Sequence, residues 1–323
     1  MRISLRPFLA TVALVAALPW VPAQAYPDRP IKLILPFPAG SATDGTARVI
    51  AEDLRTSLGQ PVIIENQAGA DGNIAALNVK RAAPDGYTLL MSTNSAHAVN
   101  KTLYSNLAFD PEKDFEPVAG LISIPLTLLV RSDFPADDVA GFLRLAKQRS
   151  GSRPLSFGSG NTSGQVAAAL LESAAGIEIT VVPYRGTPQA LTDLVGGQID
   201  ALLADPYSSM GFVNSGQLKV LAVTDDVRHP LLPKAPTMAE AGFKDVRVVT
   251  WAALFAPAKT DPAIIDKLNK EVAKSLSKQE TKDAVQKMAM TPMLMSPAEL
   301  RSFVQKEIER WGRLVKLAAI PKK

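Results

Sequence analysis

Short apolar runs alternate with amphipathic runs along most of the chain, and this alternation predicts an α/β fold. The segment 31–35 is rich in Ile and Leu and is expected to be a buried strand. Behind it, apolar residues recur at helical spacing over 45–58, which predicts an amphipathic helix. The intervening segment 36–44 contains prolines, a glycine and hydroxyl side chains, so it is expected to form a tight loop at the helix N-terminus.

The same pattern continues through two further strands, predicted at 61–65 and 87–91. A glycine-bearing loop at 66–73 leads into a helix between them, and polar residues 92–97 follow the third strand. In open α/β sheets the ligand crevice lies at the carboxyl ends of the strands. The loops 37–44, 66–73 and 92–97 are therefore expected to share one cleft.

Two long apolar stretches, 117–130 and 246–256, predict two passages of the chain between separate lobes. The strand and helix alternation restarts between them, and a second glycine- and hydroxyl-rich loop at 158–164 is the counterpart of the first. Further helices and strands are predicted at 137–148, 155–158, 165–175, 177–184, 187–195, 198–204, 219–224, 237–241, 262–276, 278–288, 293–295 and 297–318. The predicted division is a discontinuous first lobe of 26–127 plus 248–323, and a second lobe of 128–247.

The first 25 residues have the pattern of a secretory signal peptide. Two arginines precede an apolar run over 7–21, and Ala23-Gln24-Ala25 forms a small-x-small cleavage pattern. The alternative is an uncleaved anchor, but the apolar run is short for a bilayer and prolines interrupt its end. Cleavage after Ala25 and a periplasmic location are therefore expected. The sequence has no cysteine, so it can form neither a disulfide nor a lipid-anchored Cys.

The charge of the chain gives little reason to expect a nucleic-acid partner. Without residues 1–25, which hold two arginines and no acid, 33 basic and 31 acidic residues leave a formal charge of +2. Basic residues form no dense tract outside the final Lys322 and Lys323.

The sequence also lacks the residues of several common enzyme sites. His97 and His229 are the only histidines and there is no cysteine, so no metal or cofactor is expected. The loop at 158–164 departs from the nucleophile elbow, the Walker loop and the dinucleotide fingerprint. Two residues stay open: His97 is a general base or a structural histidine, and Asp205 contacts a ligand or caps a helix beginning at Pro206.

The two polar loops suit a small anion, because Gly, Ser, Thr and Asn at helix N-termini hold anions through neutral dipoles. For the first loop taken alone, a plain helix cap by Thr43 or Asp44 is the simpler explanation.

Several stretches taken together resemble the Bug family, the extracytoplasmic solute receptors of tripartite tricarboxylate transporters. The similarity covers essentially the whole chain after residue 25, with many motifs in the family's order. The stretches include YPDRPI at 26–31, LPFPAG at 35–40, GQPV at 59–62, APDGYTLL at 83–90, VPY at 182–184, ALTD at 190–193, LAVT at 221–224 and PTMAEAG at 236–242.

The resemblance implies a type II periplasmic binding-protein fold, in which two lobes with mixed sheets flanked by helices close over a small carboxylate-bearing solute. It further implies a monomeric receptor without catalytic activity, which passes a small organic acid to the membrane permease subunits of the transporter. An extracytoplasmic enzyme using His97 or Asp205 as base, or a receptor for a signalling partner, are the alternatives. The ligand-binding residues implied by position are Phe37, Ala39, Gly40, Ser41, Thr43, Asp44, Thr93, Ser159, Asn161, Thr162, Ser163, Tyr184, Gly186, Thr187 and Asp205.

The chain departs from the family pattern at three places near these residues. Ser41 stands where a second glycine is usual, Ala252 and Ala253 follow Trp251 where an aromatic residue is frequent, and Pro206 follows Asp205. The identity of the acid therefore does not transfer from any relative.

Overall fold

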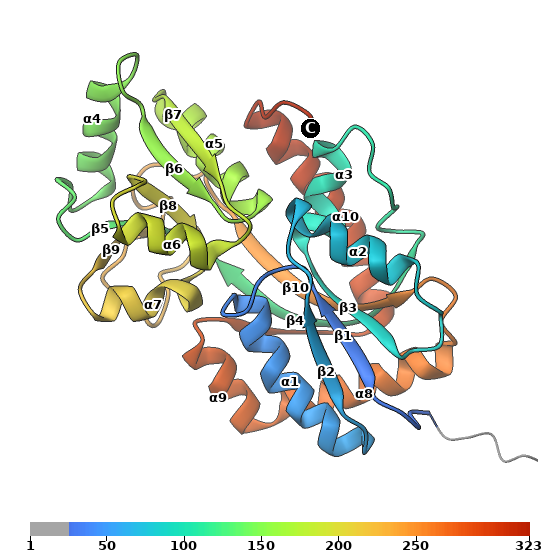
Figure 1. Cartoon of the computed structure of the whole chain (residues 1–323). Helices are drawn as coiled ribbons and strands as arrows, with labels where there is room; N and C mark the ends of the chain where they lie inside the picture. Colours follow the sequence, from blue (N-terminus) through green and yellow to red (C-terminus); the bar gives the residue numbers. More distant parts are fainter. Residues whose placement is uncertain (1–25) are drawn as a thin grey trace, which may run out of the picture.

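The computed structural model describes residues 26–323, which form two groups of strands and helices joined by extended segments (Figure 1). The elements in chain order are β1 (Ile31–Leu35), α1 (Ala42–Leu58), β2 (Val62–Asn66), η1 (Ala70–Gly72), α2 (Asn73–Lys80), β3 (Thr88–Thr93), η2 (Ser95–Val99), α3 (Asn100–Leu103), β4 (Phe115–Pro125), β5 (Thr127–Arg131), α4 (Val139–Arg149), β6 (Leu155–Ser159), α5 (Thr162–Ala175), β7 (Ile179–Pro183), α6 (Thr187–Val195), β8 (Ala201–Ala204), α7 (Pro206–Asn214), β9 (Leu218–Val223), β10 (Val249–Pro257), α8 (Pro262–Ser277), α9 (Gln279–Lys287), β11 (Thr291–Met295) and α10 (Pro297–Leu317).

The strands form two mixed sheets, as the predicted fold class requires. The first has the order β11-β4-β10-β3-β1-β2 and the second the order β7-β6-β8-β5-β9. In the first, β1 is parallel to β2 and β3, whereas β10 runs antiparallel to β3 and β4. In the second, β6 is parallel to β7 and β8, whereas β5 runs antiparallel to β8 and β9.

The parallel parts of the two sheets repeat one arrangement. The unit β1-α1-β2-α2-β3 places its strands in the order β2-β1-β3, and the unit β6-α5-β7-α6-β8 places its strands in the order β7-β6-β8. In each unit the first strand is central and the helix after it begins at the strand's carboxyl end. The third strand then pairs with an antiparallel strand that begins at a connection between the sheets, β10 in the first sheet and β5 in the second. Equivalent loops of both units are thereby available to one site.

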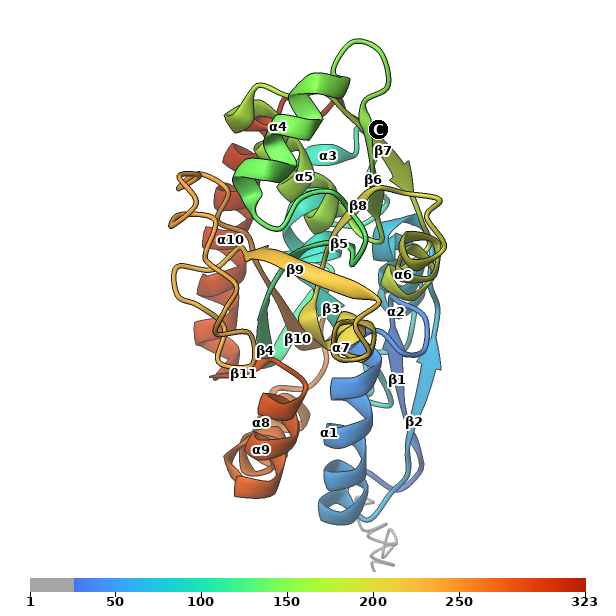
Figure 2. The same ribbon diagram turned by 90° about the vertical axis from the view of Figure 1, so that its left-hand side faces the viewer.

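Helices cover both faces of each sheet (Figures 1 and 2). On one face of the first sheet, Ile50 of α1 and Leu268 of α8 belong to the same apolar core. On the other face the core includes Val79 of α2 and Trp311 of α10, and it continues into the second sheet. The remaining face of the second sheet is covered by α6, through a core that contains Leu191.

The chain passes between the sheets at Leu126, between β4 and β5, and again between β9 and β10. Thr224 joins these two passages by hydrogen bonds. Its amide donates to the Leu126 carbonyl (2.9 Å) and its hydroxyl accepts from the Leu126 amide (2.8 Å). The same hydroxyl donates to the Val248 carbonyl (2.5 Å), and the Val248 amide donates to the Thr224 carbonyl (3.1 Å). One residue therefore links both connections.

Most predicted elements are present, with displaced ends. The first long apolar stretch is two strands rather than one, because it changes sheet at Leu126. Residues 237–241 form hydrogen-bonded turns instead of the predicted helix, and Gly242 follows them with a φ of 97°. The helices α1 and α5 each begin three residues earlier than predicted, so hydroxyl residues assigned to the loops lie in the first helical turns.

The predicted signal peptide, residues 1–25, lies outside the described residues. Between residues 26 and 323, none of the helices combines the length and the apolar character that a membrane crossing requires.

Candidate functional site

A cavity lies between the two sheets and is lined by residues from both. Its empty volume is about 470 Å³ with its open mouth included. Its lining consists of Phe37, Ser41, Ala42, Thr43, Thr93, Asn94, Ser95, Ile124, Leu126, Asn161, Ser163, Thr187, Asp205, Thr250 and Trp251.

Three of the lining residues are N-caps of helices. Ser41 caps α1 and accepts a hydrogen bond from the Asp44 amide (3.4 Å), and Asn161 caps α5 and accepts from the Gly164 amide (2.8 Å). Asp205 caps α7. Because Thr187 opens α6 as its first residue, four helices begin at this cavity. The N-terminus of a helix carries a partial positive charge and unpaired N–H groups, so their convergence favours a negatively charged guest.

The two sheets contact each other through a hydrogen bond at the cavity wall. Asn94, which follows β3, donates from its side-chain amide to the hydroxyl of Ser163 in the first turn of α5 (2.6 Å). Both residues are almost fully buried.

Thr93 presents a buried hydroxyl to the cavity. Its Oγ1 has no hydrogen-bond partner among residues 26–323, although the side chain is only 8 % exposed. A buried hydroxyl without a partner is uncommon in native proteins and costs free energy. A bound molecule with an acceptor atom would satisfy it.

Asp205 is the one ionisable side chain in the lining. One of its carboxylate oxygens accepts from the Ser208 amide (2.8 Å). Burial raises the pKa of this carboxyl, against the opposing effect of the hydrogen bonds from Ser208. Since no Lys, Arg or His of residues 26–323 lines the cavity, an anion would be held there by neutral dipoles.

The segments that connect the sheets provide the apolar wall. Leu126 lies at the first connection, and Trp251 lies on β10 just after the second. The Trp251 indole N–H donates to Glu307 of α10 (2.9 Å), which is not a cavity residue. The walls of the site are therefore built on the joint between the sheets.

These features match a known family of receptors. Residues 46–320 match the model for "Tripartite tricarboxylate transporter family receptor". The chain belongs to this family. The resemblance inferred from the sequence motifs is thereby confirmed, and the family is one of substrate-binding receptors, not of enzymes.

Individual relatives extend over nearly the whole receptor. Protein BugT of Bordetella pertussis is 34 % identical over 310 residues, covering 96 % of this chain and 94 % of its own. A solved R. palustris protein with adipate has a TM-score of 0.89 and 33 % identity, covering 92 % of this chain and 100 % of its own. MatC from Rhodopseudomonas palustris with bound malate has a TM-score of 0.83 and 32 % identity, covering 90 % of this chain and 100 % of its own. The predicted fold class is confirmed by these neighbours.

Eight of the fifteen residues predicted for ligand binding line the receptor's cavity. They are Phe37, Ser41, Thr43, Thr93, Asn161, Ser163, Thr187 and Asp205. Their contact with a ligand stays a prediction.

The other seven predicted residues do not line this cavity. Ala39 and Gly40 are exposed, Ser159 donates to the Asn161 carbonyl (2.9 Å), and Gly186 packs against Pro38. Thr162 donates weakly to Asn100 (3.4 Å), and Tyr184 donates to Asp193 (2.8 Å). These side chains shape the loops around the site.

Asp44 also has a structural role. Its carboxylate accepts from Arg48, from the Gly40 amide and from Asn66. Burial alone raises the pKa of Asp44, but these hydrogen bonds outweigh it and hold the pKa below its usual value. The buried carboxylate therefore fixes the first loop at the start of α1.

Seven lining residues were absent from the prediction. They are Ala42, Asn94, Ser95, Ile124, Leu126, Thr250 and Trp251. Asn94 and Ser95 lie in the polar segment after the third strand that was expected to reach the cleft, so the motif signal existed for them. Ile124, Leu126, Thr250 and Trp251 lie on the segments that connect the sheets, and their sequence pattern is that of buried core residues. They line a cavity only because the two connections meet there.

His97 lies away from the receptor's cavity and is fully buried. Its Nδ1 is 2.7 Å from the Ser92 hydroxyl, its ring stacks on Phe255 with centroids 3.9 Å apart, and its Nε2 has no partner among the described residues. Burial lowers its pKa to about 3. A histidine so placed is a structural residue, which decides the question that the sequence left open.

Proposed function

We propose that this receptor captures a small carboxylate-bearing organic anion between two lobes and delivers it to the permease of a tripartite tricarboxylate transporter. The convergence of four helix N-termini on one cavity without a basic side chain carries the proposal. Such a site binds an ionised carboxylate through oriented N–H and hydroxyl groups. The unpartnered hydroxyl of Thr93 supplies a further donor.

The ligand class follows from the same chemistry and from the relatives. The related solved structures contain adipate and malate, both of which are small dicarboxylates. When ionised, Asp205 repels a ligand carboxylate placed close to it. Protonation of Asp205, or a ligand N–H group at that position, removes this repulsion. A dicarboxylate therefore has to be long enough, or so oriented, that its second carboxylate lies away from Asp205.

Capture works by closure of the lobes. We assign residues 26–127 plus 248–323 to one lobe and 128–247 to the other, with the joint at Leu126, Thr224 and Val248. Hinge closure around a ligand is the usual motion of two-lobed receptors. The receptor would act as a monomer in the periplasm after cleavage following Ala25, and the closed, loaded form would be the one that meets the permease.

The decisive experiment is native mass spectrometry of protein purified from the periplasm, followed by thermal-shift measurements with adipate, malate and the neutral diamide of adipate. A ligand that binds the native state raises the melting temperature by mass action. We expect a retained small acid or stabilisation by a dicarboxylate, with no shift by the diamide. Equal stabilisation by adipate and its diamide would contradict binding of an ionised carboxylate.

A substitution in the cavity wall tests where the ligand binds. Ser41→Arg introduces a long side chain at a position that is 6 % exposed in the cavity wall, so it should abolish the ligand-induced shift. It also removes the cap of α1, which costs about 1 kcal/mol of folding free energy. A variant that folds and still gives the full shift would show that the ligand binds elsewhere.

A further inference from the structure

Glu307 is a buried carboxylate in α10 that receives hydrogen bonds from two tryptophans. Its Oε2 accepts from the indole N–H of Trp251 (2.9 Å) and from that of Trp311 (2.8 Å). The residue is 7 % exposed. Buried indole N–H groups need an acceptor, so this carboxylate determines how both rings are oriented.

Only one of the two rings belongs to the ligand cavity. Trp251 lines the cavity and is 2 % exposed, and its ring also packs edge-on against Phe303 with centroids 5.3 Å apart. With its N–H committed to Glu307, this indole presents no free donor to the cavity. The wall at Trp251 is apolar for that reason.

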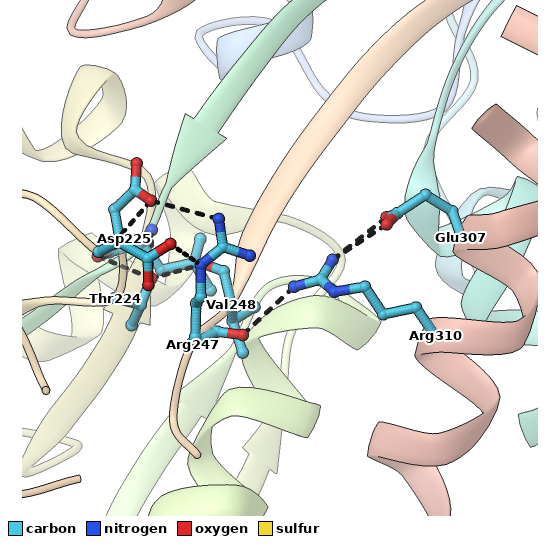
Figure 3. A network of polar contacts seen from close by, with 8 residues as sticks. Thr224, Asp225, Arg247, Val248, Glu307 and Arg310 are labelled. Atoms are coloured by element: carbon cyan, nitrogen blue, oxygen red, sulfur yellow. Dashed lines mark hydrogen bonds and ion pairs between the residues drawn. The ribbon is translucent and has the colours of Figure 1, made fainter. Parts of the chain in front are cut away.

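The same carboxylate is connected to the joint between the sheets. Arg310, one turn further along α10, donates from one guanidinium nitrogen to Glu307 (3.2 Å) and from another to the main-chain carbonyl of Arg247 (3.3 Å). Figure 3 shows Arg310 lying between Glu307 and the chain segment at Arg247 and Val248. Val248 is hydrogen-bonded to Thr224, the residue that links both connections.

Ion pairs hold the far side of this segment. The Arg247 side chain donates to Asp226 (2.5 Å). It also lies 3.8 Å from the carboxylate of Asp225, the residue that follows Thr224 in the chain (Figure 3). The contacts thus run without a break from the cavity wall through α10 to the joint.

We propose that Glu307 is a positioning residue for ligand binding, which holds the Trp251 indole in the cavity wall and, through Arg310, ties it to the joint between the lobes. The inference rests on the proposed binding function. A neutral glutamine at this position keeps one acceptor oxygen but loses the charge, and it turns an amide NH2 either towards the two indole N–H groups or towards the Arg310 guanidinium. The Trp251 N–H is then held less firmly, and a ligand acceptor in the cavity becomes a competing partner. Loss of Glu307 therefore alters which acids bind as well as how tightly.

The test compares Glu307→Gln with Glu309→Gln, a change of the same chemistry two residues along the helix. Glu309 is exposed, and its side chain makes no hydrogen bond among the described residues. Affinities for adipate and malate are measured by calorimetry, because a purely structural defect would weaken both acids alike. For Glu307→Gln we expect about tenfold weaker binding of the tighter acid and a changed ratio of the two affinities. Glu309→Gln should match the parent protein.

Intrinsic fluorescence reports directly on the two indoles. A chain starting at Tyr26 contains only Trp251 and Trp311, since the third tryptophan is at position 20. In a Trp311→Phe background all emission comes from Trp251. Glu307→Gln in that background should shift the emission maximum and increase quenching by acrylamide, whereas Glu309→Gln should change neither.

Arg310→Gln tests the connection to the joint while keeping the carboxylate, and it guards against misfolding of Glu307→Gln, since Arg310 is partly exposed. We expect it to weaken both acids without a shift in Trp251 emission. If the parent protein binds the acids and Glu307→Gln binds them with the same affinities and the same affinity ratio, this inference alone is overturned. Parent protein that binds no acid at all would overturn the proposed function, and this inference with it.

Discussion

The ring of Tyr207 from α7 lies directly over Gly45 in the first turn of α1. A methyl group added at Gly45 would stand 2.7 Å from the ring carbon Cζ and from the hydroxyl oxygen. The two residues belong to helices that cover different sheets, and α7 lies next to the N-terminal end of α1 in Figure 2. Because Gly45 has no side chain, α7 of one lobe can approach α1 of the other this closely.

Gly45→Ala should weaken ligand binding while leaving folding intact. Alanine stabilises a helix over glycine by about 0.5–1 kcal/mol, so the ligand-free protein should melt no lower. The added methyl forces the Tyr207 ring aside or keeps the lobes apart, and a closed form that is ten times rarer lowers the apparent affinity about tenfold. Calorimetry with the best acid of the panel measures the effect.

Gly211→Ala is the control, because Gly211 lies in α7 with nothing within 4 Å of an added methyl. It should leave affinity unchanged. In a Tyr207→Ala background the effect of Gly45→Ala should disappear, as a double-mutant cycle requires of a direct contact. If the affinity losses of Gly45→Ala and Tyr207→Ala simply add in the double variant, the contact between these residues does not affect closure.

Thr93→Val should separate stability from binding. The substitution keeps the side-chain shape and removes a buried hydroxyl that has no partner among residues 26–323. We expect the free energy of unfolding to rise by about 1 kcal/mol and the affinity to fall about tenfold. Urea denaturation and calorimetry give the two values.

Thr46→Val provides the comparison, since the buried Thr46 hydroxyl donates to the Ala42 carbonyl (2.9 Å) and does not line the cavity. It should lose stability without a change in affinity. Unchanged affinity in Thr93→Val would show that this hydroxyl does not contact the ligand.

Asp205→Asn should change the pH dependence of binding. Asparagine also caps helices well, so α7 keeps its first turn. Binding of an anion beside Asp205 raises the pKa of a carboxyl that burial has already raised, so binding takes up a proton and affinity increases as pH falls. A rise of one pKa unit corresponds to about tenfold in affinity. The variant should bind a dicarboxylate more tightly near neutral pH, with a flatter pH profile.

The opposite outcome for Asp205→Asn is equally informative. If the ligand carries an ammonium group, the carboxylate is its partner, and the variant should bind more weakly wherever Asp205 of the parent protein is ionised. Calorimetry in buffers of different ionisation enthalpy detects the proton uptake that only the dicarboxylate case requires.

His97 should make the fold less stable in mild acid. Burial lowers its folded pKa from 6.5 to about 3, so between these values the unfolded chain binds a proton that the folded chain excludes. Stability is therefore unaffected by this group above about pH 6.5 and falls by up to about 1.4 kcal/mol per pH unit below it. Urea denaturation of the parent protein and of His97→Gln near pH 7 and pH 5 measures the difference. Equal pH slopes would contradict the buried neutral state.

The sequence predicted the fold well where local signals were strong. Asp205 caps α7, which is one of the two roles that the sequence left open for it, and 293–295 lies within the edge strand β11. The start of α1 was misjudged because Ser41, Thr43 and Asp44 are all good caps. The choice of Ser41 depends on Asp44 being engaged by Arg48 and Asn66, and Asn66 is distant in sequence.

The cavity could be predicted only in its polar half. Residues at strand ends and helix starts have local signatures, whereas Trp251 and Leu126 are apolar residues inside long apolar stretches. Their exposure to a cavity depends on two connections meeting, which is a tertiary property. The interaction of Glu307 with Trp251 joins residues 56 positions apart and leaves no pattern in the sequence.

The repeated strand and helix arrangement gives the cavity an approximate two-fold character. Ser41 after β1 and Asn161 after β6 are equivalent caps, and each half contributes one of them. The halves differ at the ends of their third strands, where β3 ends at Thr93 and β8 is followed by Asp205. The two strand ends thus bring a hydroxyl and a carboxyl to the same cavity. We expect this pair to set the direction in which an unsymmetrical acid lies, so exchanging the two side chains should reverse the preferred orientation.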